Sequence, residues 1–464
     1  MERAAIERAA RLAGLEIHPD TDIEIDGADP VFAAPFHLGE GAATALALVG
    51  QEASAIGEMR GGRRQSLQVS VRHAAASLVS YTQLRVPERP TPPRVASAIT
   101  AIYRCGDERY IHLHGSFEQG RGIFAELGIE FGADAEAIAA ATAKRGAFEL
   151  EDALAVKGRC AAVVRSPEEW NRTPQAAWLL SRPTVEVTRI GDAPPEPLPE
   201  GSRPLSGVRV VDATRVLAGP TCARTLAEHG ADVVHIASPN LPTSDAFEVD
   251  TGHGKRQAWC DLNDPAQAAQ LRELLRDADV FSQGFRLGKL AGRGLSPEQL
   301  AELRPGIIYV SENCYGQVGP WAPRPGWEQL AQTVSGVAHV MGQDGGGPRL
   351  SGAAMNDYST GYFSALGAMI ALRRRAIEGG SWLVRTSLTQ TSMWYLRLGV
   401  ELDRATGQGL GDTSAFVEDV PAVGEATYGP MQRLRPALQM SETQPHWATP
   451  AVPLGSGSME WLPR

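Results

Sequence analysis

One turn of the sequence, Thr214 to Pro220, combines features that suit binding of an anionic ligand. A β-branched run at 208–212 precedes it, and a helical stretch follows. A turn from a parallel strand into a helix offers unpaired backbone N–H groups and the positive end of the helix dipole to a phosphate. Arg215 would add a guanidinium, although the same residues also suit a plain turn with a solvated arginine. The absence of a G-x-G-x-x-G pattern argues against a dinucleotide-dependent oxidoreductase.

Two acidic residues further along could act as a nucleophile or as an acid–base group. Asp357 stands before a run of small residues, 359–361, at the predicted start of a helix. Small residues let a ligand or another backbone approach closely, but an Asp in this place is most commonly a helix cap. Glu328 follows Pro325-Gly326-Trp327 and equally suits the surface of a helix. The residues alone leave both interpretations of each acid open.

The elements that must position these residues alternate between strand and helix. Short apolar runs at 208–212, 232–236, 279–281 and 307–310 are separated by helical stretches. Such alternation predicts an α/β fold, with a parallel sheet covered by helices in a Rossmann-like large domain. The carboxyl ends of parallel strands are where such proteins bind ligands, which is where the turn at 214–220 would lie.

Proline-rich stretches at 87–93 and 193–204 divide the chain, because proline fixes φ and lacks a backbone donor. Two short strands that flank Gly106-Asp107 indicate a small α+β domain before the large one. We expect four parts: a partial copy of the third part at 1–86, the small α+β domain at 94–192, the large α/β domain at 204–395, and an extended C-terminal tail at 396–464.

The partial copy is suggested by a repeated pattern. Residues 39–78 contain a helix of small residues, a glycine turn, a strand, a serine and a second helix, as the third part also does. Aligning Gly41 with Gly361 places His37 where Asp357 stands. We therefore expect the first copy to lack the acidic side chain and to be structural.

Composition and charge exclude several classes of protein. The 464 residues carry 44 Lys and Arg against 54 Asp and Glu, a net charge of −10, which argues against a nucleic-acid-binding protein. The five cysteines are far apart and form no C-x-x-C pair, so we expect neither a disulfide framework nor a zinc site. The charged start does not read as a signal peptide, and no apolar run approaches a membrane span. These features predict a cytoplasmic protein.

Four stretches in this order and spacing resemble the class III CoA-transferase family, which includes formyl-CoA and carnitine CoA-transferases and α-methylacyl-CoA racemases: VRVVDATRVLAGPTCARTLAEHGADVVHI, DVFSQGFRLGKLAGRGLSPEQL, RPGIIYVSENCYGQVGPWAPRPGWEQLAQTVSGVAHVMG and MNDYSTGYFSALGAMIALRRR. They cover about residues 205–395, and the stretch 434–456 is similar to the family's closing segment. Residues 36–80, 101–128 and 166–172 also resemble family segments. They precede the sheet domain instead of following it, as in a permuted or partly duplicated relative.

The resemblance implies a reaction and assigns residues to it. Asp357 would attack the thioester carbonyl of an acyl-CoA, giving first an anhydride and then an aspartyl-CoA thioester. A carboxylic acid acceptor would reverse these steps and leave as the new CoA ester, with no metal involved. Glu328 matches an acidic residue near the nucleophile. The CoA contacts carry over to Arg215, Val216, Leu217, Ala218, Gly284, Phe285, Arg286 and Arg293, with Lys289 as a nearby cation.

Two further stretches bear on this site. Ala237-Ser238 stands where many relatives have a charged pair, which places one contact to the adenine or a phosphate in doubt. The glycine-rich loop at 343–347 is a candidate to stabilise an oxyanion and equally suits a surface turn.

The resemblance also implies partners and leaves alternatives. We expect an acyl-CoA, a carboxylic acid acceptor and a second chain, in an interlocked homodimer or a heterodimer with a homologous subunit, without nucleic acid or membrane. A racemase of the same family would carry a histidine where Trp327 stands. A non-catalytic partner subunit of an active homologue is the other alternative, against which the presence of Asp357 argues.

Overall fold

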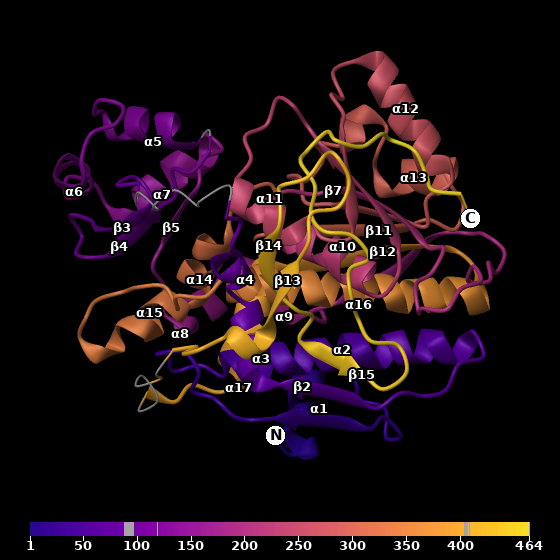
Figure 1. Cartoon of the computed structure of the whole chain (residues 1–464). Coiled ribbons are helices and arrows are strands. Elements are labelled where there is room, and N and C mark those ends of the chain that lie inside the picture. The colour runs from indigo at the N-terminus through magenta and orange to yellow at the C-terminus, as the bar shows by residue number, and fades with distance from the viewer. Residues whose placement is uncertain (88–96, 118, 403–406, 408, 464) are drawn as a thin grey trace.

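A seven-stranded sheet forms the centre of the protein (Figure 1). The structure is a computed structural model that describes residues 1–87, 97–117, 119–402, 407 and 409–463, so the predicted linker at 87–93 lies almost wholly outside the described residues. The strands are β6 (Glu186–Gly191), β7 (Arg209–Ala213), β8 (Asp232–Ala237), β9 (Lys255–Trp259), β10 (Val280–Gln283), β11 (Ile308–Asn313) and β12 (Ser381–Ser387). Their order is β6-β12-β11-β10-β7-β8-β9, with every pair parallel except β12 with β6. The predicted α/β class with a parallel sheet is confirmed.

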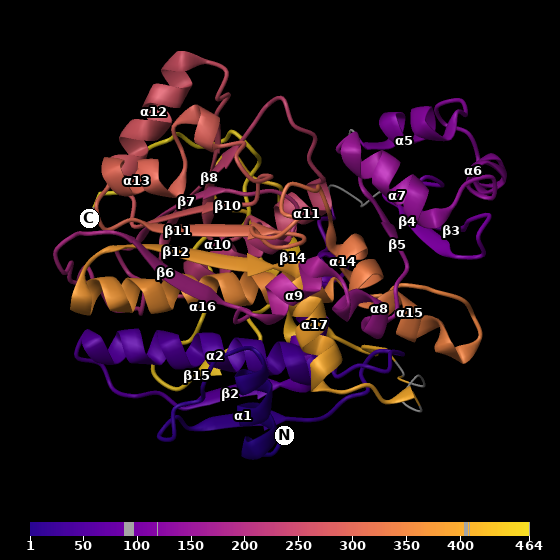
Figure 2. The same cartoon turned by 180° about the vertical axis from the view of Figure 1, so that it is seen from behind.

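Helices cover both faces of this sheet (Figure 2). The helices α10 (Ala218–Glu228) and α16 (Met355–Glu378) lie on one face, and α12 (Pro265–Arg276) and α13 (Pro297–Leu303) lie on the other. Val210 packs with the first pair and Val211 with the second, because successive strand side chains point to opposite faces. Two covered faces explain why the strands read as continuous apolar runs.

A smaller α+β unit lies beside the main body (Figure 1). Its antiparallel sheet has its own apolar core, which includes Ile111, Leu113 and Phe124. The elements are β3 (Ala101–Arg104), β4 (Tyr110–Leu113), α5 (Gln119–Leu127), α6 (Ala135–Thr142), α7 (Ala147–Val156) and β5 (Ala161–Val163). The chain returns to the large sheet through α8 (Pro167–Asn171) and α9 (Pro174–Leu180). The unit falls within the residues predicted for the small domain.

The N-terminal residues form a further layer below α16 (Figures 1 and 2). Here β1 pairs with β2 in parallel, and β15 from the C-terminal tail pairs with β2 on its other side, so the tail contributes a strand to this sheet. The elements of this layer are α1 (Arg3–Leu12), β1 (Ile23–Asp26), α2 (Leu38–Met59), β2 (Leu67–Ser70), α3 (Val71–Ser77), α4 (Ser80–Gln83) and β15 (Leu438–Met440). The long helix α2 packs against α16.

The remaining elements are short and connect the layers. They are α11 (Asp245–Thr251), η1 (Ala291–Arg293), α14 (Glu328–Ser335), α15 (Val337–Met341), η2 (Gly342–Asp344), α17 (Leu388–Leu398), η4 (Ser414–Phe416), β13 (Val417–Val420) and β14 (Met431–Leu434). All five cysteines are buried, and none of them forms a disulfide in the described part of the chain. In the described ranges, no helix is both long and apolar enough to cross a membrane.

A helix–strand–helix arrangement occurs twice among the described elements. The first unit is α2, β2 and α3; the second is α16, β12 and α17. Their first helices begin at residues 38 and 355, and their second helices at 71 and 388, an offset of 317 in both cases. At the same offset Gly50 faces Leu67 and Gly367 faces Val384, so the two helices meet their strands in matched positions.

This register corrects the alignment of Gly41 with Gly361. It places Glu40, not His37, opposite Asp357, because His37 precedes the first helix and Asp357 is the third residue of its helix. The two glycines do not match because each fits a different neighbour: Gly41 lies against Tyr395, and Gly361 lies against α10. The first copy therefore does carry an acidic side chain at this position.

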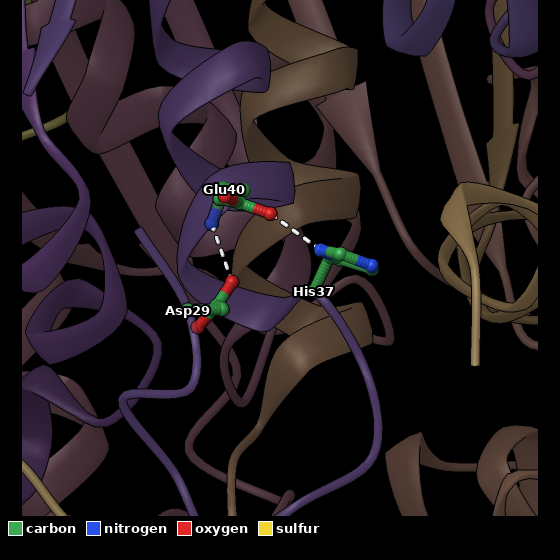
Figure 3. A group of neighbouring side chains, drawn as sticks. All are labelled: Asp29, His37 and Glu40. Atoms are coloured by element: carbon green, nitrogen blue, oxygen red, sulfur yellow. Dashed lines mark hydrogen bonds and ion pairs between the residues drawn. The ribbon is translucent and has the colours of Figure 1, made fainter. Parts of the chain in front are cut away.

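The carboxylate of Asp29 caps the start of α2 (Figure 3). Its carboxylate accepts hydrogen bonds from the N–H groups of Gly39 (3.3 Å) and Glu40 (2.9 Å), the second and third residues of α2. His37 in turn hydrogen bonds to Glu40 and lies 3.2 Å from Glu401. Asp29, His37 and Glu40 thus interact with the backbone at the start of α2, with each other and with Glu401.

Candidate active site

Asp357 opens into a cavity at the carboxyl edge of the large sheet. Asp357 is 7% exposed, and the cavity has a volume of about 120 Å³. The lining residues come from the first βα turn, the end of β10, the end of β11 and the segment before α14: Ala213, Thr214, Arg215, Val216, Leu217, Ala218, Gly284, Phe285, Arg286, Glu312, Asn313, Cys314, Ala322, Arg324, Pro325, Gly326, Trp327, Asp357 and Leu388. The structure thus brings Asp357 together with seven of the eight residues predicted to contact CoA.

Small residues place Asp357 there by letting two helices approach closely. A Cβ on Gly361 would lie 2.6 Å from the carbonyl oxygen of Ala218, so only glycine fits between α16 and α10. The hydroxyl of Ser359 is bonded to Tyr395 (2.6 Å), and that of Thr360 to Thr391 (2.7 Å). The small residues at 359–361 therefore serve helix packing and do not line the cavity.

Glu328 lies behind Asp357 and does not line the cavity. The Glu328 carboxylate accepts hydrogen bonds from the backbone N–H groups of Asn356 (3.3 Å) and Asp357 (3.1 Å), and from the side chain of Gln332 (2.6 Å). These backbone groups belong to the second and third residues of α16, the same positions that Asp29 holds in α2. Glu328 is thus an anionic acceptor at a helix N-terminus.

Burial dominates the electrostatics of this acid pair. Burial raises the pKa of Glu328 to about 7, against the hydrogen bonds that favour its charged form. Burial, the charge of Glu328 and that of Glu312 raise the pKa of Asp357 well above its ordinary value. Two carboxylates in one dry site resist ionising together, so Asp357 is a carboxylate kept in an unfavourable environment.

A second cavity of about 490 Å³ adjoins the first and is lined by cations. The two share Arg215, Arg286 and the end of β10. Lys289 and Arg293 line only the second cavity, so all eight predicted CoA contacts line one cavity or the other. Ser238, from the position where a contact was in doubt, lines it too.

Local structure fixes the cationic side chains around this second cavity. Arg293 donates to the carbonyl oxygen of Leu262 (2.7 Å) and to Asn263 (2.9 Å). Arg215 donates to the carbonyl oxygen of Pro242 and lies over the ring of Phe117. The cluster suits a ligand with several phosphates.

The first βα turn has an unusual backbone. Val216 adopts a φ of +73°, a left-handed conformation that a β-branched residue rarely takes. Such strain persists where the surrounding structure holds it, and it clusters at ligand sites. Val216, Leu217 and Ala218 of this turn line the same cavity as Asp357.

The glycine-rich loop at 343–347 and two buried histidines lie outside both cavities. None of the loop residues 343–347 lines either cavity; Asp344 instead pairs with Arg349. The buried His112 and His114 hydrogen bond to Thr333 (2.9 Å) and Gln329 (3.0 Å), respectively, and line neither cavity.

Sequence reasoning did not find Glu312. This residue lies at the end of β11 and is 6% exposed. An acid at the carboxyl end of a predicted parallel strand was the signal that could have identified it.

The fold and the cavities define a class of protein: an α/β protein with a buried carboxylate next to a cation-lined site for an anionic ligand. Comparison with known proteins makes this specific. The model of CoA-transferase family III matches residues 205–419. An acyl-CoA transferase from Gibberella moniliformis is 34% identical over 451 residues, which cover 88% of this chain and 78% of that protein. The chain belongs to CoA-transferase family III.

Further similarities are partial. The beta subunit of a succinyl-CoA–L-malate CoA-transferase from Chloroflexus aurantiacus is 33% identical over 201 residues, which cover 40% of this chain and 50% of that subunit. A solved CAIB/BAIF family protein from Brucella suis is 27% identical with a TM-score of 0.41, covering 50% of this chain and 65% of that one. Family membership gives CoA transfer as the general class of reaction and CoA thioesters as the class of substrate.

Proposed function

We propose that this chain moves CoA from an acyl-CoA to a carboxylic acid through a covalent adduct on Asp357. The observation that supports this most directly is the position of Asp357. It opens into the cavity lined by Arg215–Ala218 and Gly284–Arg286, and that cavity continues into a cation-lined space. A carboxylate suits the chemistry because it can attack a thioester and later leave from an anhydride.

The reaction consists of two exchanges at Asp357. Its carboxylate attacks the thioester carbonyl, the C–S bond breaks, and a mixed anhydride forms. The CoA sulfur then attacks the Asp357 carbonyl of the anhydride and releases the first acid. The second acid reverses both steps and leaves as the new CoA ester. Glu328 acts as a positioning residue, because it holds the N–H of Asp357 and does not line the cavity.

Trp327 favours transfer over racemisation. A racemase must place an acid–base pair on either side of the α-carbon. The indole of Trp327 lines the cavity where racemases of the family carry a histidine, and an indole does not titrate.

An acid acceptor and a second chain complete the proposal. One relative is by name a beta subunit that acts with L-malate, which supports a dicarboxylic acid as the first acceptor to test and an assembly of two chains. The packing of α2 against α16 supports another arrangement, in which the first copy takes the partner's place within one chain.

A transfer assay tests the function. The purified chain is incubated with succinyl-CoA and a panel of carboxylic acids, and new CoA esters are separated by chromatography. We expect transfer to at least one acid, complete loss in Asp357→Asn, and no effect of Asp277→Asn, an exposed aspartate. Transfer at the wild-type rate in Asp357→Asn would contradict the assignment.

A further inference from the structure

The cavity beside Asp357 holds a second carboxyl group that the proposed exchanges leave unused. Glu312, at the carboxyl edge of the sheet, lines this cavity although the residue is only 6% exposed. Within the described residues, its Oε2 atom has no hydrogen-bond partner. A buried acid with an unused oxygen beside a nucleophile calls for a chemical explanation.

Two glycines make room for this carboxyl group. A Cβ on Gly219 would lie 2.6 Å from Glu312 Oε1, and a Cβ on Gly284 would lie 3.1 Å from the same atom. Gly219 follows the turn predicted to contact CoA, and Gly284 is itself a predicted contact. Glu312 therefore lies where the two CoA-contacting turns meet.

The surroundings of Glu312 keep a proton on it at neutral pH. Burial, and then the negative charge of Asp212 on β7, raise the pKa of Glu312 to about 8; the N–H of Gly219 and the charge of Lys255 on β9 oppose this rise. Asp357 on α16 and the buried thiol of Cys222 on α10 also interact with it. Asp212 and Lys255 are paired at 2.8 Å, so their opposite effects on Glu312 partly offset each other, and burial is the main cause of the raised pKa.

The departing sulfur must enter the space that Glu312 faces. In an acyl-CoA the sulfur is bonded to the carbonyl carbon that Asp357 attacks. Both atoms must therefore lie in the cavity of about 120 Å³ that Asp357 and Glu312 share. As Asp357 becomes a neutral anhydride its negative charge passes to the sulfur, and an unprotonated thiolate in this dry site is unfavourable.

Resting on the proposed function, we propose that Glu312 is a catalytic acid that protonates the departing CoA sulfur and takes the proton back when that sulfur attacks the anhydride. In the first step the C–S bond breaks and its electron pair takes the proton from the Glu312 O–H group, leaving a thiol and a carboxylate. In the second step the Glu312 carboxylate removes this proton. The sulfur bonds to the Asp357 carbonyl, the anhydride C–O bond breaks, and the first acid leaves.

The CoA thiol and the Glu312 carboxyl group have similar pKa values, which suits proton exchange between them. An ordinary thiol has a pKa of about 8.5, close to the pKa of Glu312. Proton transfer between groups of similar pKa is easy in both directions, as a step that must run forward and back requires.

Single-turnover kinetics test the proposal. The full chain is mixed with succinyl-CoA without an acceptor, and the species bound to Asp357 is followed by intact mass from pH 5.5 to 9.5. Glu312→Gln keeps the shape and an acceptor oxygen for Gly219 but has no proton to give, while Glu312→Asp keeps the proton. Glu302→Gln, an exposed change on α13, is the matched control.

We expect the wild-type rate to fall above about pH 8, where Glu312 loses its proton, and to be lower in D₂O. Glu312→Gln should be about 10²-fold slower at pH 7 and should lack the alkaline decline, which Glu312→Asp should keep. A Glu312→Gln variant with the wild-type rate and alkaline decline would overturn the inference while leaving the function intact. If Glu312→Gln does not fold, a wild-type rate that shows neither the decline nor the D₂O effect would overturn it. A wild type that forms no species on Asp357 would instead contradict the proposed function.

Discussion

At the scale of residues, the site depends on a pair of acids with different tasks. Asp357 opens into the cavity, while Glu328 accepts the backbone N–H of Asp357 from behind. Glu328 thus fixes the first turn of α16, and its negative charge makes ionisation of Asp357 less favourable. The nucleophile is therefore held in place by a group that also keeps its carboxylate reactive.

The first prediction follows from this repulsion. Transfer requires ionised Asp357, so the rate should rise with pH as the pair loses protons, with the pKa of Glu328 at about 7. Glu328→Gln removes the charge that raises the pKa of Asp357 but keeps an oxygen for its N–H. We expect the rising part of the kcat/KM profile to move to lower pH. A lower rate with an unmoved profile would show that Glu328 is only structural.

At the scale of elements, the sequence was sufficient to predict the parallel sheet. It was not sufficient to predict why residues 359–361 are small. A continuous apolar strand such as 208–212 indicates a sheet that is buried on both faces, and this pattern can be recognised from neighbouring residues alone. The run 359–361 reads equally as room for a ligand or for a helix, because the neighbour that fills the room lies far away in sequence. Here the neighbour is α10. The task of Glu328 depends likewise on a contact across 29 residues that no spacing rule supplies.

The second prediction concerns the contact between α10 and α16. Alanine favours a helix over glycine by about 1 kcal/mol, so Gly361→Ala should stabilise α16 unless space is lacking. Its Cβ would lie 2.6 Å from the Ala218 carbonyl oxygen, and we expect a net loss of about 1–3 kcal/mol in the free energy of unfolding. Gly292→Ala, with nothing within 4 Å of the new Cβ, is the control. Denaturant unfolding of both variants checks this, and an unchanged Gly361→Ala would contradict the packing account.

At the scale of the whole molecule, the chain contains one unit twice. The sequence pattern suggested a repeat, and its alignment of Gly41 with Gly361 differs by three residues from the offset of the element starts, because the two glycines serve separate packing contacts. The element starts give the correct register and place Glu40 opposite Asp357. The cation-lined space adjoins the cavity of Asp357, which belongs to the second unit. Its lining comes from the small α+β unit, the first βα turn and segments 236–327, and includes no described residue of the first unit.

The third prediction concerns assembly. The family resemblance implies a dimer, and we expect the purified chain to sediment at about twice 49.5 kDa, alone or with a homologous subunit. Sedimentation at micromolar and nanomolar concentrations measures this. A fully active 49.5 kDa species at both would contradict the dimer and would support the arrangement in which α2 replaces a partner's helix within one chain.

The central claim, that Asp357 carries the acyl group and then CoA, is tested most directly by mapping the covalent species. The chain is incubated with succinyl-CoA, treated with hydroxylamine, digested, and analysed by peptide mass spectrometry. Hydroxylamine converts an anhydride or thioester on a carboxylate into a hydroxamate at that residue. We predict a hydroxamate on Asp357 in the wild type and in Glu302→Gln, and none in Asp357→Asn. A wild-type protein that transfers CoA without any modification of Asp357, or with the modification on Glu312 or Glu328, would contradict the account.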